Sequence, residues 1–262
     1  MSYDLLVFEK RGIPTNRPDF LNWYIQKLEN EDEQDISCVS EKLQRFFHSV
    51  RHIFPPMNGE FAPDDQELSE NPKMEEYLCD YSITEDMIYL SFAYSVSEFA
   101  YNTIKRAAYF ADVGFFNSSD DESAPVLFDS RCPMLIEGEW FRPMETDSFE
   151  SIREKLNNMT VKNRSYLYVT DQVGNYIQIG GYGDSFTVER RIYTDPVTYI
   201  HAKAGCDDID NSDKAGKVTI AGNPVKVRQN QILSKAMAEQ LFLDFFQGLE
   251  TVDSIEWVEM DI

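Results

Sequence analysis

Residues 166–193 read YLYVTDQVGNYIQIGGYGDSFTVERRIY, and this stretch decides the fold of the C-terminal half. It contains three runs rich in β-branched and aromatic residues, at 166–170, 176–180 and 186–193. Short segments rich in Asp, Asn and Gly separate these runs, as hairpin turns do. Strands joined by such short turns pair antiparallel, so the stretch predicts a β-meander.

Turn-forming and helix-capping residues also separate the predicted elements on both sides of this stretch. A short helix is predicted before it, with Asp147 and Glu150 as caps, and a final helix is predicted to begin after Ser234 and to end at Gly248. The turn at 221–224 has hairpin composition. Further strands are predicted at 197–203, 218–220, 225–228 and 255–258.

The N-terminal half mixes predicted helices with strands of a smaller sheet. One helix opens at Pro18, because proline suits the first helical position, and a second is capped by Ser40. A third is predicted from a capping box at Ser95 and Glu98 to a glycine end at Gly114. We expect these helices on one face of the sheet. The predicted strands are 3–9, 80–83, 87–93 and 113–116, with a short strand-like run at 126–128.

Helical spacing of apolar residues predicts which side of the first two helices is buried. The second helix is expected to end before the two prolines at 55 and 56, since proline cannot continue the hydrogen-bond ladder. The expected buried residues are Phe20, Leu21, Tyr24, Ile25 and Leu28 on the first helix, and Leu43, Phe46, Phe47, Val50 and Phe54 along the second.

A polar, acidic stretch at 117–125 marks the boundary between the two halves. Residues 1–130 hold 25 acidic and 10 basic side chains, whereas residues 131–262 hold 21 and 14. We therefore predict two small domains, 1–135 and 136–262. The predicted fold class is α+β, with each domain a largely antiparallel sheet packed with a few helices.

The charge of the chain excludes several function classes. With 46 acidic against 24 basic side chains, the formal net charge is −22. Nucleic acids and anionic membrane surfaces are bound through clustered Lys and Arg, so neither is expected as a direct partner. A field of this sign instead steers basic partners towards the protein.

The cysteines and the N-terminus indicate a cytoplasmic protein. Cys38, Cys79, Cys132 and Cys206 lie far apart with no CxxC spacing, so we expect four reduced thiols. The first residues have no basic start, long apolar run or small-residue cleavage site, which a secretory signal would need. No apolar run approaches the length of a membrane span.

No group of residues has the pattern of a catalytic or metal site. His48 and His52 are four apart on a predicted helix, but no glutamate stands between them as in HExxH and no third ligand is evident. His201 lies in a predicted strand, away from any nucleophile signature. We therefore expect a protein that is not an enzyme, with no metal and no cofactor.

Two loops resemble ligand-binding motifs only loosely. The run at 180–183 (GGYG) lacks the GxGxxG spacing and a following helix, so a hairpin or bulge is favoured. The run at 207–213 (DDIDNSD) lacks the glycine and glutamate of a calcium loop, so a solvated acidic loop is favoured.

The C-terminal half, roughly 145–260, resembles the first immunity-protein family of bacterial polymorphic toxin systems. The resemblance rests on residues 166–171 (YLYVTD), residues 175–181 (NYIQIGG), the following short strands, a helix of AEQLF type and a terminal strand that ends IEW at Trp257. Residues 2–8 (SYDLLVF) and 54–59 (FPPMNG) are similar to a module found in uncharacterised bacterial proteins, which implies no activity.

The resemblance implies an immunity protein that binds and neutralises a cognate toxin domain in the cytoplasm by blocking a basic surface. Toxins paired with the family are commonly nucleases or nucleic-acid deaminases. Exposed acids and a tyrosine are the natural contact groups. The predicted partner-binding residues are Tyr182, Asp184, Asp207, Asp208 and Asp210.

A second hypothesis belongs to a different class. The chain is then an enzyme or a small-ligand-binding protein whose site lies between the two domains, where ligand sites often occur. A third is an adaptor without a toxin partner. The neighbouring genes discriminate between these, because a toxin reading frame immediately upstream favours immunity and a metabolic operon favours an enzyme.

Overall fold

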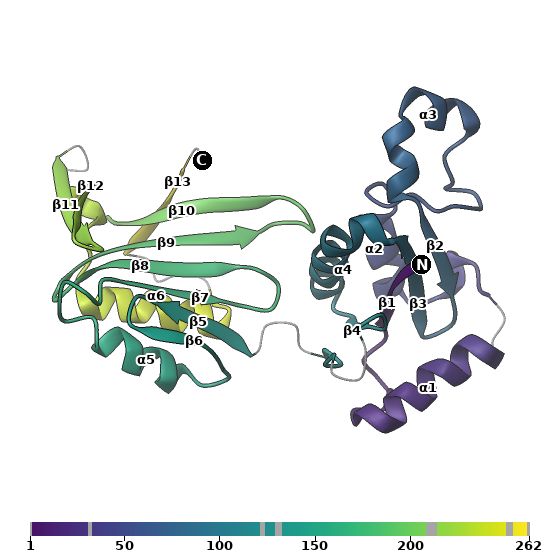
Figure 1. Ribbon diagram of the computed structural model, residues 1–262, viewed down its shortest axis with the longest axis horizontal. Coiled ribbons are helices and arrows are strands. Elements are labelled where there is room, and N and C mark those ends of the chain that lie inside the picture. The colour runs from purple at the N-terminus through teal and green to yellow at the C-terminus, as the bar shows by residue number, and fades with distance from the viewer. Residues whose placement is uncertain are drawn as a thin grey trace. The chain divides into compact units, whose positions relative to one another are not determined.

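A computed structural model of the chain describes residues 2–30, 33–120, 124–128, 133–207, 214–249 and 254–260. Its contacts divide the chain into two compact units, Met1–Ser130 and, apart from residues 195–197, residues 131–262. Each unit is an antiparallel sheet packed with helices, which confirms the predicted α+β class (Figure 1). None of the helices in the described ranges is long and apolar enough to cross a bilayer.

The first unit contains a four-stranded sheet with the order β2-β3-β1-β4, in which every neighbouring pair is antiparallel. β1 is an interior strand, and Leu5 lies opposite Leu90 of β3 and Asn117 of β4. All four strands lie within one residue of their predicted ranges. They are β1 (Ser2–Phe8), β2 (Cys79–Ile83), β3 (Met87–Ala93) and β4 (Gly114–Asn117).

Helices cover both faces of this sheet, because β1 is apolar at every position from Leu5 to Phe8. Leu5 and Val7 pack in one core with α2 (Glu41–Val50) and α4 (Ser97–Ala111). Leu6 and Phe8 point to the opposite face and pack in a second core with α1 (Arg17–Asn30) (Figure 1). The expectation of helices on one face is therefore wrong, since a strand without polar positions needs cover on both sides.

The start of α2 agrees with the sequence, but the helix ends at Val50, earlier than predicted. The Ser40 hydroxyl accepts a hydrogen bond from the Leu43 N–H at 3.2 Å, as an N-cap does. Every apolar residue predicted on the buried side of this helix is buried. The shorter helical segments of the unit are η1 (Ile36–Cys38), α3 (Asp65–Glu70), η2 (Pro72–Tyr77) and η3 (Tyr94–Val96).

The ends of α4 differ from the prediction. The capping box of Ser95 and Glu98 does not form, because Ser95 is inside η3 and the N-cap position falls to Val96, which has no side-chain acceptor. The helix ends at Asp112, which takes the left-handed conformation with φ of 58°, and not at Gly114. Hydrogen bonds from two lysines, Lys10 and Lys42, lower the pKa of Asp112 to about 2.

The second unit contains a seven-stranded antiparallel sheet with the order β13-β10-β9-β8-β7-β5-β6, and a separate hairpin of two strands. Two strands, β5 and β6, are additions to the predicted set. The sheet consists of β5 (Met134–Gly138), β6 (Phe141–Thr146), β7 (Tyr166–Thr170), β8 (Tyr176–Tyr182), β9 (Ser185–Tyr193), β10 (Tyr199–Cys206) and β13 (Ile255–Glu259), and the hairpin of β11 (Ala215–Ile220) and β12 (Asn223–Arg228).

Both helices of the second unit, α5 (Phe149–Asn157) and α6 (Lys235–Gln247), share one core with a single face of the sheet. Ile152 and Phe242 are buried there against Leu167 and Val188. α6 begins and ends as predicted, with the Ser234 hydroxyl accepting from the Met237 N–H and Gly248 in the left-handed conformation. A further short turn, η4 (Gln229–Gln231), precedes α6.

Two smaller expectations for the junctions are wrong. Asp147 does not cap α5, because the N-cap position falls one residue later, at Ser148, which makes no side-chain cap bond. The strand-like run at 126–128 forms only an isolated bridge, between Leu127 and Phe115. The predicted turn at 171–175 does form: the buried Asp171 carboxylate accepts bonds from the Val173 and Asn175 backbone N–H groups.

Two substitutions on α1 test whether this helix covers the second face of the four-stranded sheet. Phe20 is fully buried among aromatic rings, whereas Ile25, which helical spacing also placed in the core, is 43% exposed. We expect Phe20→Ala to lower the free energy of unfolding by about 3–5 kcal/mol. Ile25→Ala, the matched control, should lower it by less than about 0.5 kcal/mol. Urea denaturation measures both, and equal losses would contradict this packing.

Candidate functional site

The strands of the seven-stranded sheet have two different faces. Residues such as Leu167, Ile177 and Val188 point to the helices, and the residues between them point to the face that no described helix of the unit packs against. Those residues are mainly aromatic or charged. We call this surface the tyrosine face, and its members are Tyr166, Tyr168, Tyr176, Gln178, Thr187, Glu189, Arg191, Tyr193, Tyr199, His201 and Lys203.

Glu189 is at the centre of a polar row that crosses this face. The register places it opposite Gln178 on β8 and Lys203 on β10. Gln178 donates a hydrogen bond to one carboxylate oxygen, and the Lys203 ammonium lies 2.9 Å from the other. His201 Nε2 lies 3.5 Å from the carboxylate as well. With 17% of its side chain exposed, Glu189 is a largely buried charge, and these partners offset the cost of burying it.

Arg191 organises the neighbouring row of tyrosines. Its guanidinium carbon lies 4.6 Å from the ring centre of Tyr176, 5.1 Å from that of Tyr199 and 5.6 Å from that of Tyr193. Tyr193 and Tyr199 also pack edge to face, with ring centres 5.6 Å apart. Cation–π contacts and edge-to-face pairs both have preferred geometries, so this group holds its rings in defined positions.

Burial favours the neutral form of two phenols of the tyrosine face, those of Tyr168 and Tyr176. Burial raises the pKa of Tyr168 and of Tyr176 above the ordinary value, and for Tyr176 the Arg191 charge opposes that increase. Tyr168 and Tyr199 nevertheless remain 37% and 46% exposed. The face thus exposes hydroxyl groups on apolar rings.

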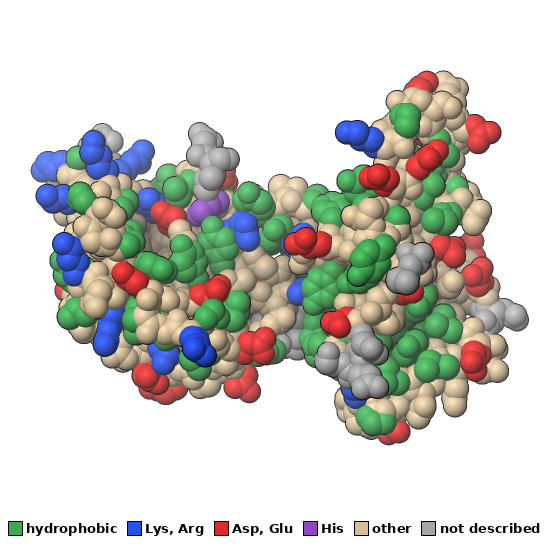
Figure 2. All heavy atoms as spheres, in the orientation of Figure 1, with side chains coloured by type: hydrophobic (Ala, Val, Ile, Leu, Met, Phe, Trp, Pro, Cys, Tyr) green, Lys and Arg blue, Asp and Glu red, His purple; other side chains and the backbone are tan. Residues whose placement is uncertain are grey.

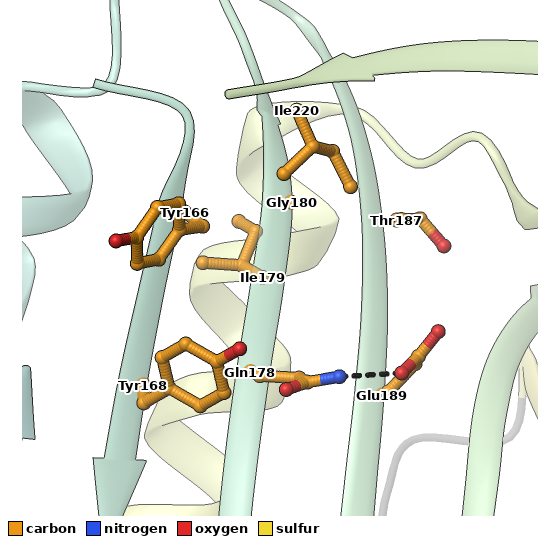
Figure 3. A pocket seen from close by; sticks show the side chains of 8 residues that line it. All are labelled: Tyr166, Tyr168, Gln178, Ile179, Gly180, Thr187, Glu189 and Ile220. Carbon is orange, nitrogen blue, oxygen red and sulfur yellow. Dashed lines mark hydrogen bonds between the residues drawn. The ribbon is translucent and has the colours of Figure 1, made fainter. Parts of the chain in front are cut away.

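A hollow of about 70 Å³ lies at one end of the face (Figure 3). Figure 3 shows Tyr166 and Tyr168 on the strand at one side and Thr187 and Glu189 on the strand at the other, with Ile220 of the β11–β12 hairpin above. Thr187 is only 4% exposed, and its hydroxyl has no hydrogen-bond partner among the described residues. A polar group of a partner that enters the hollow can bond to it.

Glycine at position 180 allows the hairpin to approach the sheet. A Cβ atom there would lie 2.2 Å from Cδ1 of Ile220, which is closer than real contacts allow. The hairpin itself is basic at Lys214, Lys217, Lys226 and Arg228, all of which are exposed. Figure 2 shows Lys and Arg side chains gathered at the end of the second unit where β11 and β12 lie. The described residues of this hairpin are therefore basic within an acidic chain.

The predicted partner-binding residues that the structure describes lie at one end of the same sheet. Tyr182 and Asp184 belong to the β8–β9 turn, which includes Gly183 at φ of 73°, so the predicted hairpin there is confirmed. Tyr182 is half-buried, and the exposed Asp184 accepts a hydrogen bond from the Lys235 N–H at the start of α6. Asp207 is exposed directly after β10. Asp208 and Asp210 lie outside the described residues.

Histidines and cysteines do not form a site in the parts of the chain that the structure describes. His48 is exposed on α2, but this helix ends at Val50, so His52 lies in the turn that follows and not on the helix. No group of three or more His, Cys, Asp or Glu residues that could hold a metal ion occurs in the described ranges. Cys38, Cys79 and Cys206 are free thiols, and Cys132 lies outside those ranges.

The tyrosine face itself was missed by the reading of the sequence, although a signal for it was present. Polar and aromatic residues occur at every second position of β7, β8 and β9, between the apolar residues of the core. A strand pattern of period two with Tyr, Arg and His on the polar side indicates a sheet surface whose side chains contact one another, and not only a face exposed to solvent. The acidic loops, by contrast, are recognisable in the sequence by their charge alone.

Removing the charge of Arg191 should change the titration of Tyr176. Because that charge lowers the pKa of Tyr176, Arg191→Gln should raise this pKa further. Since a raised folded-state pKa means that stability is lost as the pH rises above about 10, the variant should also lose more stability in that range. NMR titration of ¹³C-labelled tyrosine measures the pKa. Arg142→Gln, on the exposed strand β6, is the control, and an unchanged Tyr176 in Arg191→Gln would contradict the contact.

Comparisons with protein-family models, with curated proteins and with solved structures found no match to this chain. The resemblance of residues 166–171 and 175–181 to an immunity-protein family thus stays an expectation. What the chain does has to follow from the chemistry of its own surfaces, and the tyrosine face is the surface on which contacts, burial and charge are most closely organised.

Proposed function

We propose that this chain is an immunity-type inhibitor that binds a basic toxin domain, and we expect that domain to be the product of the gene immediately upstream. The observation that carries the proposal is the tyrosine face, a sheet surface built from Tyr, Arg and His that no described helix of its own unit covers. Tyrosine and arginine are the residue types enriched at the energetic centres of protein interfaces. The cytoplasm of the producing cell is the proposed location.

The rigidity of the face favours tight binding. Its side chains stand on paired strands, and Arg191 is in contact with three rings at once. A surface that is ordered before a partner arrives loses less conformational entropy when the complex forms. Tyrosine also buries a large apolar ring while its hydroxyl group keeps a hydrogen bond, so it suits the dry centre of an interface.

The contacts within the face favour a protein partner over a nucleic acid. Single-stranded nucleic acids bind by stacking bases on free aromatic faces. Here Tyr193 and Tyr199 pack edge to face, and Arg191 lies over the ring of Tyr176. Since the rings are already engaged with one another and with a cation, they are better suited to side chains and loops of a folded partner.

The negative charge of the chain acts at longer range in this proposal. Within the face, Glu189 is balanced by Lys203, so the contact surface itself is not strongly acidic. The net charge of −22 belongs to the chain as a whole and steers a basic partner during approach. Tyr182, Asp184, Asp207, Asp208 and Asp210 are proposed as the rim of the interface, where charges affect the association rate more than the final affinity.

Replacing two tyrosines tests the face directly. We expect Tyr176→Ala and Tyr199→Ala each to weaken binding of the purified upstream gene product about 30-fold, because a tyrosine at the centre of an interface contributes about 2 kcal/mol or more. Calorimetry after co-purification of the wild-type pair measures this. Tyr94→Ala is the control, since Tyr94 is 61% exposed in the first unit. Equal effects of all three substitutions, or no complex with the wild type, would exclude the proposal.

Salt dependence tests the charge at the rim. Changing Asp207, Asp208 and Asp210 together to Asn should slow association with the same partner and flatten its salt dependence between about 50 and 500 mM, where the Debye length falls below 10 Å. The melting temperature should change little. The control removes three exposed acids of the first unit, with Glu70, Glu75 and Glu76 changed to Gln. Wild-type association that is insensitive to salt would disprove the electrostatic part alone.

A further inference from the structure

A second hollow lies in the first unit, beside the edge strand β2. Its volume is about 290 Å³, close to the lower end of the size range of ligand sites. Three segments line it: residues 33–36, residues 56–61 and part of β2, with Phe47 of α2 beneath. These segments are distant in sequence, so only the fold brings them together.

The hollow is next to a gap in the hydrogen bonding of β2. On the outer side of this strand, the Cys79 N–H donates to Pro55 and the Cys79 carbonyl accepts from Met57, both at 2.9 Å. Four residues further along the strand, the Ile83 carbonyl accepts a hydrogen bond from the Gln34 N–H at 2.8 Å. Backbone groups two residues apart in a strand point the same way, so those of Tyr81 also point outwards. They have no hydrogen-bond partner among the described residues.

Aromatic rings form the apolar wall of the hollow. Phe47 packs edge to face against Tyr81, with ring centres 5.2 Å apart, and against Phe61, at 5.6 Å. Phe61 already receives one guanidinium of this chain, since the carbon of Arg51 lies 4.3 Å from its ring centre. Arg51 is not among the lining residues. The wall is thus of a kind that packs against planar cations.

The rim of the hollow selects the charge of what can enter. Glu33, Asp35, Glu60 and Asp80 all line it and are exposed, and no Lys, Arg or His lies among the lining residues that the structure describes. Hydrogen bonds from Ser37 lower the pKa of Asp35, which keeps that carboxylate charged at neutral pH. An anionic group would therefore be repelled, and a cation would be attracted.

We propose that this hollow binds an arginine side chain presented by a protein partner. A guanidinium group has five N–H donors in a plane, so it can bond to the free Tyr81 carbonyl and to a carboxylate while its flat face packs against a ring. An ammonium group lacks the planar fork and the flat face. The site is in the first unit and does not depend on the tyrosine face, so either proposal can fail without the other.

The test uses a small probe and the whole chain. Nα-acetyl-arginine N-methylamide is titrated into ¹⁵N-labelled protein, and the backbone amides of Tyr81 and Phe61 are followed by NMR. We expect saturable shifts at these amides. The citrulline analogue, which has the same shape without the charge, should bind at least about tenfold more weakly, and the lysine analogue should be weaker than arginine.

Matched variants separate the site from the general charge of the chain. Asp80→Asn combined with Glu60→Gln should weaken the arginine probe at least about threefold, because each rim carboxylate contributes modestly. Glu75→Gln combined with Glu76→Gln removes the same charge from η2, outside the hollow, and should change binding less than about 1.5-fold. Equal affinity for arginine and citrulline, equal effects of the two double variants, or no shift of the Tyr81 amide with 50 mM probe would each overturn the proposal.

Discussion

One-sided burial of the seven-stranded sheet is the constraint on which the rest of the second unit depends. The helices α5 and α6 bury Leu167, Ile177 and Val188, and the pleat then forces the residues between them to the other face. A shift of the register by one residue would bury Arg191 and expose the core. The same packing that stabilises the unit therefore holds the tyrosines and Arg191 in place, and no separate device is needed to order them.

In the first unit both faces of the sheet are packed against helices, so the surface available to a partner differs from that of the second unit. Because β1 is apolar at consecutive positions, helices pack against both faces of the sheet. What remains accessible is the edge of the sheet at β2, where flanking segments pair with Cys79 and Ile83 but not with Tyr81. Edge strands are normally protected from unwanted pairing by such flanking segments and by charge. Here both are present, and they leave a hollow between them.

Much of this fold could be predicted from local patterns. The strands of the central meander, the caps at Ser40 and Ser234 and the glycine end at Gly248 depend only on residues close in sequence, and the structure has them all. β6 was missed because an edge strand is partly exposed, its apolar pattern is weak and Pro143 reads as a strand breaker. β5 is an interior strand, but its apolar run of Met134 to Ile136 is short and falls at the predicted domain boundary. Helix cover on the second face of the first sheet depends on long-range packing, which spacing along α1 does not reveal.

The sites were less predictable than the fold. Polar alternation along β7 to β9 was visible in the sequence, but its meaning depends on which strands become neighbours and on which sheet face the described helices cover. The hollow beside β2 requires residues near positions 34, 57 and 81 to meet, and no local signal indicates that. Acidic loops, in contrast, are recognisable at once from composition, which says little about contacts.

The contact between Ile220 and Gly180 also has an evolutionary consequence. Since the side chain at 220 occupies the space where a Cβ at 180 would be, the two positions share one volume. A larger residue at 180 requires the Ile220 side chain to move or to be shortened, so substitutions at these two sites should be non-additive. In related sequences the residues at positions 180 and 220 are expected to covary. Their sizes should then indicate how closely the basic hairpin packs on the sheet in each sequence.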